Sequence, residues 1–384
     1  MTDSQTQMYA QIEAIVRPWH QALDDPAAAQ QGVLRRLLAG YARTDYGTRH
    51  GDVERITSIE EYRATFPAVT HADLQPVLRR VMGGDVHALL SEPPVGWAMT
   101  RGTTKGESKY IPLTATEARE RSCFSPRALL NWALRTDHLE VLAGWDLNLN
   151  FPSQVGSLRV DGQEVAYGYS SGIYARQGAQ GGGLRIVPTQ QEIDALGGGT
   201  TTADWEARFE LAYQQARDKR VTMLIGVTQT ALQFARYLKR QHGVYPKDVW
   251  KEMVVLVLTS IAGIHTKYRP ALRALYGSVD VVEIYGATEG LFAQQLNGQP
   301  YVCPNYDGYL FEVETSRGTK MWHEMQRGEY GQVIVSTSVL PRYRIGDILL
   351  SYGGLYYRCI GRERPFAYLR YRLESLWNGD FTWV

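Results

Sequence analysis

Residues 283–290 read EIYGATEG and close an apolar run, residues 279–284, that has the pattern of a buried strand. Directly after that run, an aromatic ring (Tyr285), a hydroxyl (Thr288) and a carboxylate (Glu289) stand among glycines. In open α/β sheets, ligands bind outside the carboxyl ends of the strands. A flat ring beside a hydroxyl and an acid at such an end suits a nucleotide with its metal ion. The octapeptide is therefore the first candidate for a nucleotide site.

The sequence before the octapeptide alternates between strand and helix patterns. The segments are, in order, 221–227 (strand), 230–241 (helix), 253–258 (strand), 267–276 (helix) and 279–284 (strand). Strands that are apolar on both faces and alternate with helices are typical of parallel sheets covered by helices on both sides. We expect an α/β fold with mixed and parallel sheets flanked by helices.

The rest of the chain divides by texture into a helical start (1–95), the α/β part (96–300) and a β-rich portion (301–361). Together they form one expected large domain, 1–361, followed by a short tail, 362–384. A two-residue hairpin is predicted at Gly353-Gly354, between strands at 347–352 and 355–359. The two glycine triplets within residues 176–201 predict a surface loop or flap.

Composition excludes several classes of protein. The formal net charge is +1, so no basic field argues for nucleic acid binding. The three cysteines (Cys123, Cys303, Cys359) form neither a disulfide framework nor a zinc motif, which favours a reduced, cytoplasmic setting. The amino-terminal residues have no signal-peptide character, and no apolar run reaches 18 residues, so we expect no membrane span.

Two further polar stretches accompany the octapeptide. Residues 100–109 read TRGTTKGESK between strand patterns at 95–99 and 110–113. Glycines let successive N–H groups turn toward an anion, while hydroxyls and lysines add hydrogen bonds and charge. The spacing is not that of a Walker A loop, and a solvated hairpin turn explains the stretch equally well. Residues 342–347 read RYRIGD, and Asp347 between two strands can accept both hydroxyls of a ribose, or merely cap a turn.

One motif points to a different class of enzyme. Residues 168–172 read GYSSG and match the G-x-S-x-G turn of α/β-hydrolases, with Ser170 as the nucleophile. That motif must lie between a strand and a helix. A strand at 165–169 is predicted, but residues 173–178 carry no helical stripe, which disfavours a hydrolase.

The three stretches, in this order, resemble the motifs of the Gretchen Hagen (auxin-responsive promoter) family of acyl-acid amido synthetases, within the adenylate-forming acyl-ligase superfamily. Residues 100–109 resemble S-S-G-T-[ST]-x-G-x-x-K, residues 285–289 resemble Y-G-x-[ST]-E, and residues 343–347 resemble Y-R-x-G-D. Weaker similarities extend the match over about residues 41–362. The implied fold is the large amino-terminal domain of an adenylate-forming ligase.

The resemblance implies an ATP- and Mg²⁺-dependent ligase that activates a small carboxylic acid as an acyl-adenylate and condenses it with an amine or amino acid. It assigns the phosphates to Thr103, Thr104 and the loop amides, the adenine to Tyr285, the α-phosphate to Thr288, Mg²⁺ to Glu289 and the ribose to Asp347. The full set of implied nucleotide-binding residues is Thr100, Gly102, Tyr285, Gly286, Ala287, Asp347 and Arg362. The implied catalytic residues are Thr103, Thr104, Lys109, Thr288 and Glu289.

Two departures from the family pattern leave alternatives open. Arg101 replaces a motif hydroxyl with a cation, although arginine can clamp phosphate bidentately. Only residues 363–384 follow the hinge-like Arg362, where the family has a mobile lid domain. A carrier or partner protein that supplies the lid or the acceptor is therefore expected. The alternatives are a ligase that forms a thioester on coenzyme A or a carrier protein, the Ser170 hydrolase, and a degenerate, non-catalytic acyl or nucleotide binder.

The acyl pocket is assigned only to a group of large aromatic residues, which are more often core than pocket. They are Trp97, Trp132, Trp145, Tyr167 and Tyr169.

Overall fold

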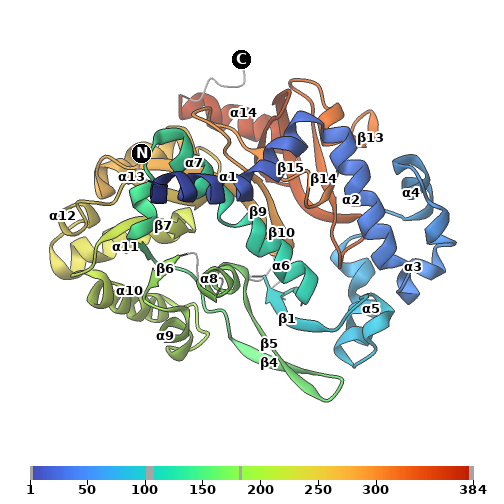
Figure 1. Ribbon diagram of the computed structural model, residues 1–384, viewed down its shortest axis with the longest axis horizontal. Helices are drawn as coiled ribbons and strands as arrows, with labels where there is room; N and C mark the ends of the chain where they lie inside the picture. Colours follow the sequence, from blue (N-terminus) through green and yellow to red (C-terminus); the bar gives the residue numbers. More distant parts are fainter. Residues whose placement is uncertain (1–2, 101–107, 181–183, 380–384) are drawn as a thin grey trace.

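The computed structural model describes residues 3–100, 108–180 and 184–379, and its strands form three sheets (Figure 1). The largest sheet has the strand order β11-β10-β9-β8-β7-β3-β6. Neighbouring strands from β6 to β9 are parallel, whereas β10 and β11 are antiparallel additions. Its strands are β3 (Trp145–Leu147), β6 (Arg185–Val187), β7 (Val221–Gly226), β8 (Val255–Thr259), β9 (Asp280–Ala287), β10 (Gly290–Gln294) and β11 (Cys303–Pro304). The expected α/β fold is confirmed.

Helices cover both faces of this sheet because its central strands are apolar on both sides. In β8, Val255 and Val257 join one core together with α7 (Arg127–Thr136). Leu256 and Leu258 point the other way, into a second core. That core is closed by α10 (Thr202–Ala216), α11 (Thr228–His242) and α13 (Arg269–Tyr276). Each fully buried Val or Leu side chain contributes about 1.5–3 kcal/mol, so this strand is held from both faces.

The second sheet has the order β2-β1-β5-β4 and carries the first motif. Its strands are β1 (Pro94–Met99), β2 (Tyr110–Thr114), β4 (Gly156–Val160) and β5 (Gln163–Tyr169). β1 and β2 form the expected antiparallel pair around the 100–109 loop. The base of that loop is closed twice, because Thr100 N donates to Lys109 O (3.0 Å) and Lys109 N donates to Thr100 Oγ1 (2.9 Å).

The loop or flap predicted for residues 176–201 is wrong. The described part of that segment contains the end of α8 (Ser170–Gln180), strand β6 and α9 (Gln190–Ala195). The described glycine triplet, residues 197–199, does lie outside helices and strands, so the error concerns the earlier residues. Gly172, which precedes the segment, lies inside α8, where a Cβ would collide with the carbonyl oxygen of Phe151. Close packing of α8 on residues 151–153 therefore requires a glycine at this position.

The third sheet is antiparallel, in the order β13-β12-β14-β15-β16. Its strands are β12 (Leu310–Thr315), β13 (Gly318–Met321), β14 (Tyr330–Ser336), β15 (Tyr343–Gly353) and β16 (Tyr356–Arg362). A hairpin joins β15 to β16 as predicted, but its two turn residues are Gly354 and Leu355, one position later than expected, because Gly353 still pairs with Tyr356. Residues 344–347 were expected between two strands, but they lie inside β15. Register places Asp347 opposite Arg362.

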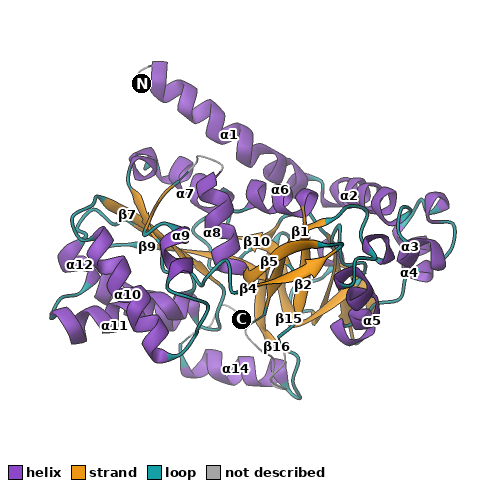
Figure 2. Ribbon diagram, turned by 90° about the horizontal axis from the view of Figure 1, so that it is seen from below, coloured by secondary structure: helices purple, strands orange, loops and turns teal. Residues whose placement is uncertain are grey.

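The residues after β16 form α14 (Ala367–Trp377), which packs on that strand and lies along the opposite side of the molecule from α1 (Asp3–Asp24) in Figure 2. The other helices are α2 (Pro26–Tyr41), α3 (Asp45–Arg49), α4 (Ile59–Thr65), α5 (His71–Met82), α6 (Ala115–Phe124) and α12 (Pro246–Val249). Short 3-10 turns are η1 (Val53–Arg55), η2 (Val86–Ala88), η3 (Leu139–Ala143) and η5 (Trp322–Glu324), and η4 (Ile264–Tyr268) is a π turn. None of the described helices combines the length and apolar character needed to cross a membrane.

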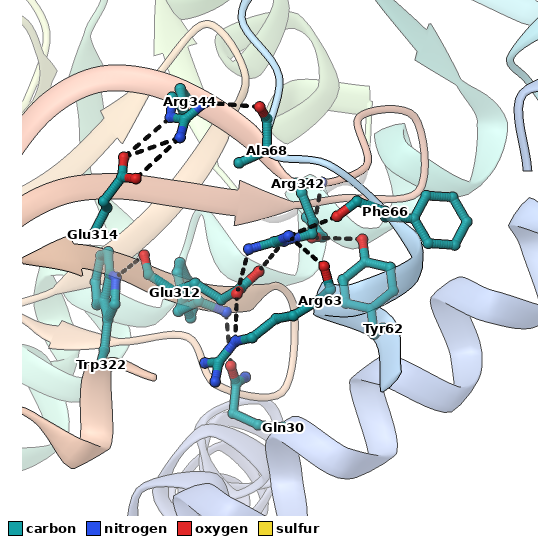
Figure 3. Close-up of polar contacts among 12 residues, drawn as sticks. Gln30, Tyr62, Arg63, Phe66, Ala68, Glu312, Glu314, Trp322, Arg342 and Arg344 are labelled. Carbon is teal, nitrogen blue, oxygen red and sulfur yellow. Dashed lines mark hydrogen bonds and ion pairs between the residues drawn. The ribbon is translucent and has the colours of Figure 1, made fainter. Parts of the chain in front are cut away.

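A buried ion cluster fastens the amino-terminal helices to the third sheet (Figure 3). The Glu312 carboxylate accepts hydrogen bonds from Arg342 Nε (3.0 Å) and Nη2 (3.1 Å), and from Arg63 Nε (2.8 Å). Arg342 Nη1 also donates to the carbonyl of Phe66 (2.6 Å), beyond the end of α4. Arg344 makes a bidentate pair with Glu314 nearby. This cluster fixes the position of β15 at the point where it enters the third motif.

Candidate active site

One cavity of about 1180 Å³ lies at the carboxyl ends of the parallel strands of the largest sheet, where α/β sheets bind ligands. Loops that follow β7, β8 and β9 contribute to its wall, together with α8, β15 and the end of β16. It is lined by all the predicted site residues that the structure describes, namely Thr100, Lys109, Tyr285, Gly286, Ala287, Thr288, Glu289, Asp347 and Arg362. Gly102, Thr103 and Thr104 lie outside the described residues. The described parts of the three motifs therefore meet in one cavity.

The second motif is a tight hairpin, and the strand before it extends beyond the expected 279–284. β9 continues through Gly286 to Ala287, Ala287 pairs with Gly290 of β10, and Thr288-Glu289 form the two-residue turn. Buried Arg121 holds this turn from α6. Its Nη1 donates to the carbonyl of Thr288 (3.0 Å) and its Nη2 to the carbonyl of Glu289 (2.8 Å).

Arg121 is itself fixed by a second buried side chain. Its Nε donates to Glu117 Oε1 (3.0 Å), and Glu117 Oε2 accepts from the hydroxyl of Ser338 (2.6 Å). An arginine with carbonyl and carboxylate partners on every side cannot turn away from the hairpin. The orientation of Thr288 and Glu289 is thus set by α6, an element that none of the three motifs includes.

Glu289 is a buried acid whose side chain faces the cavity. The residue is 4% exposed, and its carboxylate makes no ion pair with any described residue. Burial raises the pKa of Glu289, and the charge of Asp347 raises it further, while Lys109 and Arg362 act in the opposite direction. A cation that enters the cavity would therefore meet a carboxylate without a direct counter-ion.

Asp347 is held from both sides. Its Oδ1 pairs with Arg362 Nε (3.0 Å), and its Oδ2 accepts a hydrogen bond from the hydroxyl of Tyr285 (2.9 Å). Burial raises the pKa of Asp347, and the charge of Arg362 offsets part of that effect. Each oxygen keeps a second lone pair, so both can still accept a ribose hydroxyl.

Tyr285 and Gly346 support that arrangement. Tyr285 is buried, its ring packs beside Phe292 at 5.7 Å between centroids, and its hydroxyl points to Asp347. Stacking of this ring on adenine stays a prediction. Gly346 has φ +85°, a left-handed conformation that favours glycine, and Arg362 Nη1 donates across it to the carbonyl of Ile345 (2.7 Å).

The described residues contain no group of three or more His, Cys, Asp or Glu side chains that could hold a metal ion by themselves. Mg²⁺ does not need such a group, because it usually binds one or two carboxylates and completes its shell with phosphate oxygens and water. The unpaired carboxylate of Glu289, in a cavity large enough for a nucleotide, fits a metal that arrives with its phosphates.

The other sequence candidates are partly displaced. Of the five aromatic residues assigned to the acyl pocket, only Tyr169 lines the cavity, while Trp97, Trp132, Trp145 and Tyr167 pack elsewhere. Ser170 also lines the cavity and begins α8 directly after β5, so the missing helix that disfavoured a hydrolase is present. No histidine is among the described residues that line the cavity, so Ser170 lacks the usual general base there.

Two residues in this region escaped the sequence analysis. Arg121 belongs to a helix with many charged residues and has no local motif. Asp146 lies in β3, a strand of only three residues, and faces the cavity. The only available signal for Asp146 was its position in WDLNLN, residues 145–150, where polar and apolar side chains alternate as in a strand.

Comparison with known proteins agrees with this geometry. Residues 17–189 match the model of the GH3 family N-terminal domain. The structure of the acyl acid amido synthetase AtGH3.15 in complex with 2,4-DB superimposes with a TM-score of 0.76 at 18% identity, over 93% of this chain and 71% of that one. The amino-terminal part of the chain is therefore similar to the GH3 family, and the described chain shares the fold of a GH3 protein.

Curated GH3 relatives match over a shorter stretch. The probable indole-3-acetic acid-amido synthetase GH3.12 of Oryza sativa subsp. japonica is 36% identical over 105 residues, which is 27% of this chain and 17% of the relative. The jasmonoyl--L-amino acid synthetase GH3.3 of the same rice is 33% identical over 100 residues, 26% of this chain and 21% of the relative. The matched stretches thus span about a fifth or less of these GH3 proteins.

The fold extends beyond the GH3 family. The open conformation of 2-hydroxyisobutyryl-CoA ligase, in complex with 2-HIB-AMP and CoA, superimposes with a TM-score of 0.59 at 15% identity, over 86% of this chain and 74% of that one. This chain therefore has the fold of an adenylate-forming ligase, as its sequence motifs implied.

Proposed function

We propose that this chain is an ATP-dependent ligase that activates a small carboxylic acid as its acyl-adenylate and transfers the acyl group to an amine or amino acid. The observation that carries the proposal is the meeting of the described parts of three separate motifs around one cavity, with a fixed acid, Asp347, and an unpaired one, Glu289. The names of the GH3 relatives, which are amido synthetases, support transfer to an amine.

The proposed first step needs positioning more than covalent catalysis. An oxygen of the substrate carboxylate attacks the α-phosphorus of ATP, the bond between the α-phosphorus and the bridging oxygen breaks, and pyrophosphate leaves. Holding the two reactants in line can lower such a barrier by about 7–11 kcal/mol. Thr288 would orient the α-phosphate from the hairpin that Arg121 holds, and Lys109 would place a positive charge near the phosphates.

The remaining roles follow from the described contacts. Asp347, held by Tyr285 and Arg362, would accept the ribose hydroxyls. Thr100, Gly286 and Ala287 would contribute to the wall against the nucleotide, with Gly102, Thr103 and Thr104 as further phosphate contacts of the first motif. Glu289 would hold Mg²⁺, which when bound neutralises phosphate charge and so favours departure of pyrophosphate.

In the proposed second step, the amine nitrogen attacks the acyl carbon, AMP leaves with the oxygen that came from the carboxylate, and the nitrogen loses a proton. Closing the site against water during this step is commonly the task of a lid. A carrier or partner protein that supplies the acceptor belongs to this proposal. A cytoplasmic location also stays a proposal, and the absence of a disulfide among the three cysteines agrees with it.

The proposal is tested by incubating the protein with ATP, Mg²⁺ and a panel of carboxylic acids and following exchange of labelled pyrophosphate into ATP. Acid-dependent exchange is expected. An absence of exchange with every acid would contradict the ligase assignment and favour a non-catalytic binder. AMP release should then require the acid together with an amine or amino acid. Release that needs a thiol instead would assign the chain to the thioester-forming ligases.

A further inference from the structure

The cavity extends away from the motifs to a pair of buried hydrogen-bond acceptors. Asp146 of β3 and Asn150, which follows this strand, both line the cavity and are 4% and 6% exposed. The proposed activation chemistry uses neither residue.

Existing hydrogen bonds fix which atom of each side chain remains available. Ile225 N donates to Asp146 Oδ1 (2.8 Å), where the register between β3 and β7 shifts. Asn150 Nδ2 donates to Asn148 Oδ1 (3.0 Å) and to the carbonyl of Ile225 (3.3 Å). No described residue donates to Asp146 Oδ2 or to Asn150 Oδ1. Asn150 Oδ1 is an acceptor, and Asp146 Oδ2 is one in the carboxylate form of Asp146, so above the pKa of Asp146 the pair favours a ligand that brings hydrogen-bond donors.

Apolar side chains surround the two acceptors. Ile186 of β6 stands next to Asp146 in the sheet, and Ile225, Leu184 and Ala175 also line the cavity. Burial raises the pKa of Asp146 to about 7, and the hydrogen bond from the amide of Ile225 acts in the opposite direction. Neither oxygen is among the fully buried atoms that lack a partner, so both are open to the cavity, and a donor on a ligand would take the place of water there.

The position of the pair within the sheet decides which part of a substrate it can reach. β9 carries Thr288 and Glu289 beyond its end, and β3 is three strands away through β8 and β7. Neighbouring strands are about 4.8 Å apart, so the two sites are roughly 14 Å apart. Each hydrogen-bond contact takes up about 3 Å of this distance. A ligand that contacts both Thr288 and the pair therefore needs a body roughly 8 Å long. Along this path α8 provides the wall, from Ser170 to Ala179.

We propose that Asp146 and Asn150 bind a hydrogen-bond-donating group, an amino or hydroxyl group, at the end of the acid that is remote from its carboxylate. The identity of the bound molecule as the acid rests on the proposed function, whereas the donor site itself rests on the two free acceptors. The expected substrate class is a carboxylic acid with a body roughly 8 Å long and a hydrogen-bond donor at its far end.

The test uses matched pairs of acids, 4-amino- and 4-methyl-substituted phenyl-alkanoic acids with one to three methylenes before the carboxyl group. Their binding to the full chain is measured by calorimetry without ATP, and each acid is then used in pyrophosphate exchange without any amine. For at least one number of methylenes, the 4-amino-substituted acid is expected to bind about tenfold more tightly than the 4-methyl-substituted acid. The same preference is expected in pyrophosphate exchange.

Two variants isolate the contact. Asp146→Asn keeps an oxygen for Ile225 N–H but turns an N–H₂ group toward the cavity, so it should abolish the preference for the amino member. Ile186→Val enlarges the same part of the cavity and should change the affinity for both members alike. Equal binding of the two members at every chain length in the unchanged protein, or an unchanged preference in Asp146→Asn, would overturn the proposal.

The two measurements also separate this proposal from the proposed function. A preference in calorimetry without exchange by any acid would remove the ligase and leave the donor site standing. Exchange without a preference at any chain length would leave the ligase standing and remove the donor site. An effect of Asp146→Asn on the Michaelis constant of the amine alone would place the donor on the acceptor substrate, and would also overturn the proposal.

Discussion

At the scale of single residues, Glu289 carries the strongest expectation, because it is a buried acid without an ion-pair partner among the described residues. Glu289→Gln keeps its shape and removes its charge. Loss of one well-placed electrostatic contact in an active site commonly costs 10²–10³-fold in rate. We expect pyrophosphate exchange to fall by about 100-fold or more, with far-UV circular dichroism unchanged.

The matched control for this substitution is Glu252→Gln. Glu252 is an exposed acid paired with Arg220, and it precedes β8, at the end of the sheet opposite the cavity. The control should exchange at the rate of the unchanged protein. Exchange by Glu289→Gln within threefold of this control would contradict the role of Glu289.

Asp146 predicts a pH dependence of stability. Burial raises its pKa from 3.8 to about 7, so between these values the folded protein binds a proton that the unfolded chain has released. Stability therefore falls as pH rises through this window, and Asp146→Asn removes the effect. The gain in the free energy of unfolding caused by Asp146→Asn should be larger at pH 8 than at pH 5, by up to about 3 kcal/mol in urea denaturation.

Asp218→Asn is the control for this measurement, because the side chain of Asp218 is 88% exposed. Its effect on stability should be small and similar at both pH values. An Asp146→Asn gain that is equal at pH 5 and pH 8 would show that Asp146 has no raised pKa in the folded protein.

At the scale of elements, α6 acts on the second motif through Arg121. The hydrogen bonds from its guanidinium to the carbonyls of Thr288 and Glu289 require a planar fork, which lysine cannot provide. We expect Arg121→Lys to lower the exchange rate by about 10–100-fold, because a shift of the hairpin by about 1 Å can cost that much. The variant should also raise the Mg²⁺ concentration needed for half-maximal exchange.

Arg127→Lys provides the matched control, because Arg127 is a buried arginine of α7 that pairs with Asp307 and does not hold the hairpin. Both variants should lose stability. Only Arg121→Lys should change the Mg²⁺ requirement, and an unchanged requirement in Arg121→Lys would reduce Arg121 to a purely structural role.

A second prediction at this scale concerns the ion cluster of Figure 3, which joins α4 to β12 and β15. Glu312→Gln leaves the buried guanidinium of Arg342 without its counter-charge, and breaking a buried pair in this way costs about 3–5 kcal/mol. Glu314→Gln removes a partly exposed pair and should cost about 1 kcal/mol or less. Urea denaturation of the two variants checks the difference, and equal losses would contradict it.

Local signals predicted those elements whose residues decide their own structure. The capping box of Ser58 and Glu61 starts α4, and the hairpin predicted from the glycine pair forms, shifted by one residue to 354–355. α8 could not be predicted in this way, because Gly168 and Gly172 are required by close packing against residues 151–153, which local sequence does not report. The same glycines produced the misleading similarity to a hydrolase motif.

At the scale of the whole molecule, the three stretches could be selected from the sequence because together they resemble the motifs of one family, whereas their meeting in one cavity is seen only in the fold. Thr100, Glu289 and Asp347 are far apart in sequence, and the three sheets bring them to one cavity. Arg121 and Asp146 could not be predicted, because their importance comes from elements that meet only in the folded chain. Hydrogen bonds from a guanidinium to backbone carbonyls, or a carboxylate oxygen without a partner, leave no pattern in the sequence.

The central proposal is that the three motifs hold one ATP with its α-phosphorus facing the carboxylate of an acid. Transfer of oxygen-18 from a doubly labelled carboxylate, in the presence of an amino acid, tests this geometry by mass spectrometry of the nucleotide product. Attack at the α-phosphorus predicts AMP that carries one oxygen-18 atom. Unlabelled AMP, or ADP together with labelled phosphate, would contradict it.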